Sequence, residues 1–123
     1  VLEGGMITRT ISGSSELFYV RDNVNTYIQM TSGTPNRAAT GHTFLPGGLL
    51  LNWGSAPAAS NILFTFDQAF TGNPYSIQLA IATNGSSSGS YAIDNASITN
   101  TKFNALTSTG FIITVYYIAI GSA

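Results

Sequence analysis

The way apolar residues are grouped along the chain most constrains its fold. β-branched and aromatic residues occur in short runs, and Gly, Asn, Pro and Ser separate these runs. The three- to four-residue spacing of an amphipathic helix is nearly absent, whereas short runs bounded by turn residues are typical of strands. Several such strands at roughly regular spacing predict an all-β sandwich or barrel, and 123 residues suit one domain.

These runs define the expected strands. They cover Met6–Ser12, Glu16–Arg21, Thr26–Thr31, Leu49–Trp53, Ile62–Phe66, Tyr75–Thr83, Tyr91–Thr99, Lys102–Leu106 and Phe111–Ile120. Asp22–Asn25 predicts a turn, because Asn and Asp tolerate left-handed backbone. We expect Thr34–Phe44 to be irregular, Pro46–Gly48 to break the chain before the next strand, and Asn84–Ser90 to form a polar loop.

A change in composition near Phe44–Gly48 divides the chain. The charged residues Arg9, Glu16, Arg21, Asp22 and Arg37 all precede it, and the segment after it is richer in Leu, Ile, Phe and small polar residues. We therefore expect a short N-terminal β-rich neck or linker over residues 1–45 and a compact β-sandwich knob over residues 46–123.

Charged residues are unusually rare. They make up 7% of the chain, which has a formal net charge of −1, against about 25% in ordinary globular domains. Such a chain has no basic surface for nucleic acid or for anionic membranes. No apolar run reaches the roughly 20 residues of a membrane-spanning helix, so no membrane insertion is expected. Neutral hydroxyl and amide groups suit sugars as partners.

The last expected strand is apolar on both faces. Its two alternating sets are Phe111, Ile113, Val115 and Tyr117, and Ile112, Tyr116, Ile118 and Ile120. A strand with two apolar faces is covered on both sides. In a two-layer sandwich of this size, another copy of the chain could supply the second cover. A central strand beneath a long loop would produce the same pattern.

Three motifs in the second half resemble the gp53-like C-terminal domains of phage tail fibres. They are the apolar run Pro46–Gly54 that ends in Trp53-Gly54, the run Ile62–Phe70 with Phe66 and Phe70, and the closing run Gly110–Gly121 with Phe111, Ile120 and Gly121. The chain departs from the family at Asp67, where Pro is common. The resemblance covers about residues 46–123.

The resemblance implies a virion component located outside the cell. The chain would be the distal tip of a bacteriophage tail fibre, a homotrimeric knob that adsorbs the particle to its host. Its receptor would be a bacterial surface polysaccharide or an outer-membrane protein. Two alternatives stay open: a purely structural cap or trimerisation domain without receptor affinity, and a fragment of an enzyme that degrades polysaccharide.

Aromatic residues of the motifs are expected in the core rather than at a ligand. Gly54 after Trp53 would let a backbone approach where the indole packs. Phe64, Phe66 and Phe70 should start the core, and Phe111 and Ile113 should meet them from the last strand.

Catalytic and metal-binding patterns are absent from the sequence. The single His, His42, could act as a base with Asp22, Asp67 or Asp94, but no G-x-S-x-G nucleophile motif accompanies it. The chain has no Cys and no spacing typical of a metal site. We expect no enzyme, cofactor or metal. Two other roles remain for His42. Three copies could surround an ion on a trimer axis, or the residue could be a hydrogen-bonded His in a loop.

A receptor-binding site is predicted near the polar loop. Carbohydrate sites combine an aromatic face with amides, hydroxyls and a carboxylate. The candidate residues are Asn84, Ser87, Tyr91, Asp94 and Asn95, with Asn73 and Tyr75 joining from a neighbouring turn. The alternative is a solvated loop with Tyr91 packed inward.

Overall fold

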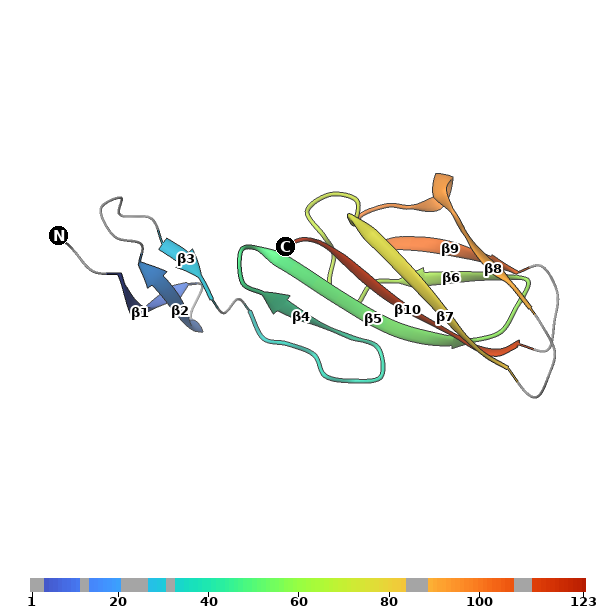
Figure 1. Cartoon of the computed structure of the whole chain (residues 1–123), viewed down its shortest axis with the longest axis horizontal. Coiled ribbons are helices and arrows are strands. Elements are labelled where there is room, and N and C mark those ends of the chain that lie inside the picture. The colour runs from blue at the N-terminus through green and yellow to red at the C-terminus, as the bar shows by residue number, and fades with distance from the viewer. Residues whose placement is uncertain (1–3, 12–13, 21–26, 31–32, 84–88, 108–111) are drawn as a thin grey trace.

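A computed structural model describes residues 4–11, 14–20, 27–30, 33–83, 89–107 and 112–123. Apart from one short 3-10 turn, the regular structure of these residues consists of strands, which confirms the predicted all-β class (Figure 1). The elements are β1 (Gly5–Ile11), β2 (Ser14–Val20), β3 (Tyr27–Gln29), β4 (Gly41–Leu45), β5 (Leu49–Pro57), β6 (Asn61–Thr65), β7 (Ser76–Thr83), β8 (Tyr91–Asp94), the 3-10 turn η1 (Asn95–Ser97), β9 (Lys102–Thr107) and β10 (Ile112–Ser122).

Strands β1, β2 and β3 form a small antiparallel sheet beside the larger body (Figure 1). On one face Phe18 is buried and meets Tyr27 edge-on at 6.5 Å, while the Arg9 guanidinium lies 4.7 Å from the Tyr27 ring centre. Met6 pairs with Tyr19 on the other face, and they are 61% and 39% exposed. This sheet has little apolar core of its own.

The larger body is a sandwich of two antiparallel sheets, which confirms the predicted β-sandwich. One sheet has the strand order β4-β5-β10-β7 and the other β6-β9-β8. Strand β10 lies at the centre of the first sheet, with Ile118 opposite Trp53 of β5 on one side and Gln78 of β7 on the other. The alternation of side chains along each strand directs one set of residues between the sheets.

The core between the sheets is largely aromatic. Phe64 stacks on Phe103 with ring centres 5.1 Å apart, and Tyr117 packs against both rings. The expected burial of Phe64, Phe66 and Phe70 is confirmed. Phe111 and the side chain of Ile113 lie outside the described residues. The buried residues are Leu50, Ile62, Phe64, Phe66, Phe70, Phe103, Ala105, Val115, Tyr117 and Ala119.

The expectation of an irregular segment over Thr34–Phe44 was wrong at its end, where β4 forms. Pro46–Gly48 does not separate two units but closes the hairpin between β4 and β5. Gly47 and Gly48 adopt φ values of 85° and 77°, which glycine reaches without steric cost. The sandwich therefore begins at Gly41 rather than at Pro46.

The expected strand Tyr91–Thr99 is also shorter than predicted. It ends at Asp94, whose carboxylate accepts the N–H of Ala96 and caps η1. Asp is favoured at such a cap because its short side chain reaches the free backbone donors. The predicted turn over Asp22–Asn25 lies outside the described residues.

Candidate functional site

The outer surface of the β4-β5-β10-β7 sheet is an apolar face. Residues opposite each other on antiparallel strands share a face, so Tyr116 and Ile118 of β10 lie beside Trp53 of β5 and Ala80 of β7. Tyr116 is 48% and Ile118 53% exposed. None of the four strands contains Asp, Glu, Lys or Arg. Among the described residues, the second sheet thus covers the inner side of β10, and Tyr116 and Ile118 on its outer side stay about half exposed.

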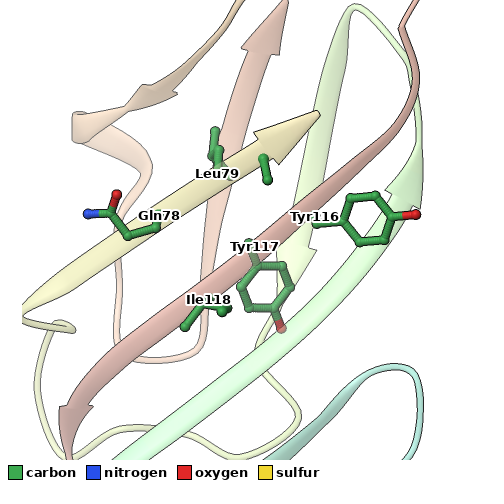
Figure 2. A pocket seen from close by; sticks show the side chains of 6 residues that line it. Gln78, Leu79, Tyr116, Tyr117 and Ile118 are labelled. Carbon is green, nitrogen blue, oxygen red and sulfur yellow. The ribbon is translucent and has the colours of Figure 1, made fainter. Parts of the chain in front are cut away.

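A shallow hollow marks this apolar face where β7 meets β10. It measures about 120 Å³ and is almost wholly apolar. Figure 2 shows Tyr116 and Ile118 of β10 and Gln78 of β7 around it. The hollow exists because Ala80, between these larger side chains, leaves space above the sheet. It is lined by Gln78, Leu79, Ala80, Tyr116, Tyr117 and Ile118.

The outer surface of the β6-β9-β8 sheet has a different chemistry, and we call it the polar face. Leu63 and Leu106 are 58% and 42% exposed on it. Carboxylate, amide, amine and hydroxyl groups surround these two side chains. They belong to Asn61, Thr65, Asp94, Lys102 and Asn104. The sandwich thus presents one uncharged apolar surface and one mixed polar surface on opposite sides.

Tyr91, the predicted aromatic of a receptor site, has structural partners. Its hydroxyl donates to the carbonyl of Ala59 at 3.1 Å and accepts the N–H of the same residue at 3.3 Å. Its ring is half-buried and packs against the core. This arrangement matches the alternative of an inward-packed Tyr91. Asn84 and Ser87 lie outside the described residues.

The predicted receptor residues that the structure describes do not gather around Tyr91 within one copy. Asp94 and the exposed Asn95 follow it at the far end of β8. Asn73 and Tyr75 precede β7, whose first residue pairs with Ile120 and whose last pairs with Ile112. At about 3.3 Å per residue, the eight residues of β7 separate that turn from the loop after Thr83 by roughly 23 Å. Asn73 and the 70% exposed Tyr75 therefore lie at the opposite end of the sandwich.

A polar cluster at the edge of the sandwich pairs His42 with Asp67, one of the three acids considered as its partner, and adds Asn36, which the sequence did not single out. His42 Nδ1 is 2.6 Å from Asp67 Oδ2, and Asn36 Nδ2 donates to the same oxygen at 2.8 Å. The hydrogen bonds from His42 and Asn36, together with the charge of His42, lower the pKa of Asp67. His42 therefore lies on strand β4 and is buried, so its expected place in a loop was wrong.

This cluster has the His–carboxylate pair that a general base uses, but its surroundings are those of a structural contact. The His42 side chain is 11% exposed, and its ring meets Phe44 edge-on at 5.4 Å. Among the described residues, no group of three or more His, Cys, Asp or Glu side chains is arranged to hold a metal ion.

Gly54 and Gly121 accommodate aromatic rings, but neither ring is that of Trp53, which was expected at Gly54. A Cβ at Gly54 would lie 2.6 Å from Tyr117 Cε1, so Gly54 makes room for Tyr117 and not for Trp53. The Trp53 ring approaches Gly41 instead, and its indole N–H donates to the carbonyl of Ala38 at 3.0 Å. Gly121 similarly admits Phe70, whose Cδ1 would be 2.7 Å from an added Cβ.

No helix in the described ranges has the length and apolar character needed to cross a membrane.

Comparison with known proteins places this sandwich among tail fibre domains. Residues 43–122 match the family model described as "Putative tail fiber protein gp53-like, C-terminal". The predicted resemblance is therefore confirmed. No protein with a curated description matches the chain.

Solved pyocin tail fibres share the fold at low sequence identity. The N-truncated R1-type pyocin tail fibre superimposes with a TM-score of 0.59 at 18% identity, over 74% of this chain and 87% of that one. The N-truncated R2-type fibre gives 0.59 at 20% identity, over 74% of this chain and 38% of that one. A longer C-terminal piece of the R1 fibre of P. aeruginosa gives 0.57 at 17% identity, over 74% of this chain and 28% of that one.

Proposed function

Because this chain belongs to the family of gp53-like tail fibre C-terminal domains, we propose that it is the distal tip of a phage or phage-like tail fibre and binds a receptor on the bacterial surface. In this proposal the working unit is a homotrimer located outside the cell. The tip adsorbs the particle without cleaving its receptor, which is a surface polysaccharide or an outer-membrane protein.

The observation that best supports the proposed trimer is the uncharged apolar face. Large exposed apolar patches on proteins in water mark surfaces that bind a partner. Tyr116 and Ile118 are about half exposed at the centre of the sheet, beside a hollow of about 120 Å³. Because none of the four strands carries a charged side chain, copies of the chain can approach through this face without repulsion.

This orientation leaves the polar face outward in the trimer. Amides, hydroxyls and charged groups of both signs there can hydrogen-bond sugars, and the same groups keep the assembly in solution. Strands β5, β7 and β9 all end at the end of the sandwich farthest from the β1-β2-β3 sheet (Figure 1). We place the receptor contact on these outward surfaces.

Mass measurement under native conditions tests the trimer. Wild-type protein should have three times the chain mass, and Ile118→Asp should shift it toward monomer because the new carboxylate would be buried between copies. Leu63→Asp is the matched control, because Leu63 is similarly exposed but lies on the polar face. A monomeric wild-type protein, or equal effects of the two substitutions, would contradict the proposed interface.

Receptor binding is tested with the purified trimer and a panel of bacterial surface glycans and outer-membrane proteins. We expect retention on the receptor, and on intact host cells, with no shortening of the glycan chains after incubation. A stable trimer that binds none of these surfaces would favour the structural-cap alternative. Shortened glycan chains would show that the protein is an enzyme that degrades polysaccharide.

A further inference from the structure

The segment Asn36–Thr40 forms a strap over the outer edge of the sandwich. Its first residue and His42 exchange two backbone hydrogen bonds, of 3.0 Å from the Asn36 N–H and 2.9 Å from the His42 N–H. Strand β4 is the edge strand of its sheet, and an unpaired edge can recruit another strand. The strap thus covers part of this edge.

The strap is also tied to the sandwich by side chains. The Asn36 amide donates to Asp67 Oδ2 at 2.8 Å, and the Asn36 side-chain oxygen accepts the N–H of Ala38 at 3.2 Å. The indole N–H of Trp53 holds the carbonyl of Ala38. Asp67 is therefore the only ionisable group among these described tethers.

One carboxylate oxygen receives both the imidazole and the amide. Hydrogen bonds to an ionised acceptor are roughly twice as strong as neutral ones, so the charge on Asp67 matters to both contacts. A protonated carboxyl could not serve both donors equally well. The ionisable groups near Asp67 are His42, whose Nδ1 lies 2.6 Å away, and Tyr117 of β10, whose hydroxyl is buried. The charged residue of the strap itself is the exposed Arg37.

We propose that the strap is an acid-sensitive latch: the carboxylate of Asp67 holds residues 36–40 closed, and loss of its charge releases them from Trp53 and from the β4 edge while the sandwich stays folded. Because the hydrogen bonds lower the pKa of Asp67, the latch is fully closed above the ordinary Asp range. It opens as the pH falls through that range, below about 4.

The sequence supplies its own reporter, because Trp53 is the only tryptophan. Opening the strap breaks the hydrogen bond of the indole and exposes its ring to water. In the 123-residue chain, acidification from pH 6 to about 3 should shift Trp53 emission to longer wavelength before the strand signal in far-UV circular dichroism is lost.

Three variants make the test specific. Asp67→Asn should give emission that does not change over this pH range, because the group at position 67 no longer titrates. Asp94→Asn, which removes a carboxylate that caps η1 on the other sheet, should keep the wild-type transition. Asn36→Asp keeps the acceptor for Ala38 but places a second carboxylate 2.8 Å from the first.

Two such carboxylates cannot both ionise comfortably, so Asn36→Asp should invert the response. Its strap should be open at pH 7 and should close on mild acidification, when one proton is shared between the two groups. The latch is refuted if Asp67→Asn retains the wild-type transition, if the emission changes only when the strands unfold, or if Asn36→Asp behaves as wild type. None of these outcomes depends on receptor binding.

Discussion

Asn52 is a buried side chain that connects β5 to the turn after β6. It is 0% exposed on β5, where its amide donates to the carbonyl of Gln68 at 3.0 Å and its oxygen accepts the Gln68 N–H at 3.0 Å. These two bonds satisfy the backbone of the turn between Phe66 and Phe70. A buried Asn on a strand is tolerated because its polar atoms are paired.

Asn52→Ala should lower the free energy of unfolding by about 2–4 kcal/mol, because it leaves both Gln68 backbone groups unpaired and removes buried volume. Chemical denaturation measures this loss. The exposed Asn95→Ala should change stability by no more than about 0.5 kcal/mol. Equal effects of the two substitutions would show that the Gln68 contact is energetically minor.

Tyr117 is a second residue with a distinctive chemistry. In the part of the chain that the structure describes, its buried hydroxyl has no hydrogen-bond partner. Burial, with a contribution from the charge of Asp67, raises the pKa of Tyr117 to about 12. The folded state thus keeps a proton that the unfolded chain releases near pH 10.

Stability should therefore fall as the pH rises from about 10 toward 12, and Tyr117→Phe should reduce this alkaline loss. At pH 7 the same substitution should leave the unfolding free energy unchanged or raise it by up to about 1 kcal/mol, since it removes an unpaired buried hydroxyl. Denaturation at pH 7 and pH 11 provides both values. A large loss of stability at pH 7 would reveal a hydrogen bond to this hydroxyl.

Sequence reasoning identified which residues carry polar chemistry but not which of them meet. Tyr91 and Asp94 satisfy backbone groups of Ala59 and Ala96, contacts that depend on where each chain turn lies. His42 of β4 and Asp67 of the turn after β6 come together across 25 residues, and no local spacing encodes that contact. Local sequence patterns therefore predict which polar residues are available better than they predict which of them come into contact.

At the scale of the element, the strand β5 depends on Gly54. Strand β10 places Tyr117 directly opposite Gly54, and the ring crosses the position that a Cβ would occupy. A side chain at this point would push the ring out of the aromatic core. Gly54 permits close packing as expected, but the ring that it accommodates is Tyr117 and not Trp53.

Gly54→Ala should destabilise the sandwich by about 1–3 kcal/mol, because the core must shift to relieve the overlap. Thermal or chemical unfolding measures the effect. Gly72→Ala is the control, since a Cβ there would meet no atom within 4 Å and should cost at most about 0.5 kcal/mol. A neutral Gly54→Ala variant would mean that Tyr117 can move freely.

Most strands of the sandwich were predictable because their apolar residues recur in short runs between turn residues. Lys102–Leu106 is one residue shorter than β9, and Ile62–Phe66 is shifted by one residue from β6. Strand β4 was missed because the glycine and proline around it indicate a loop, and because its pairing with β5 is a tertiary property.

At the scale of the whole molecule, the scarcity of charged residues should make the assembly insensitive to salt. The apolar face carries no charged side chain, so the attraction between copies in the proposed trimer is hydrophobic. Raising NaCl from 0.05 to 1 M, which shortens the Debye length from more than 10 Å to about 3 Å, should not dissociate the trimer. Native mass across this range tests the prediction, and dissociation at high salt would point to an interface that includes Arg9, Lys102 or another charged group.

The position of β10 has a consequence for how the protein is made. It follows the other described strands of the sandwich along the chain, yet it joins β5 to β7 in their sheet, and Leu49 pairs with Ser122. Contacts between residues so distant along a polypeptide form slowly and late. When all the earlier strands have been synthesised, the β4-β5-β10-β7 sheet still lacks the strand that pairs with both β5 and β7. The sandwich therefore closes only after translation has passed β10, and until then the nascent polypeptide needs protection from aggregation.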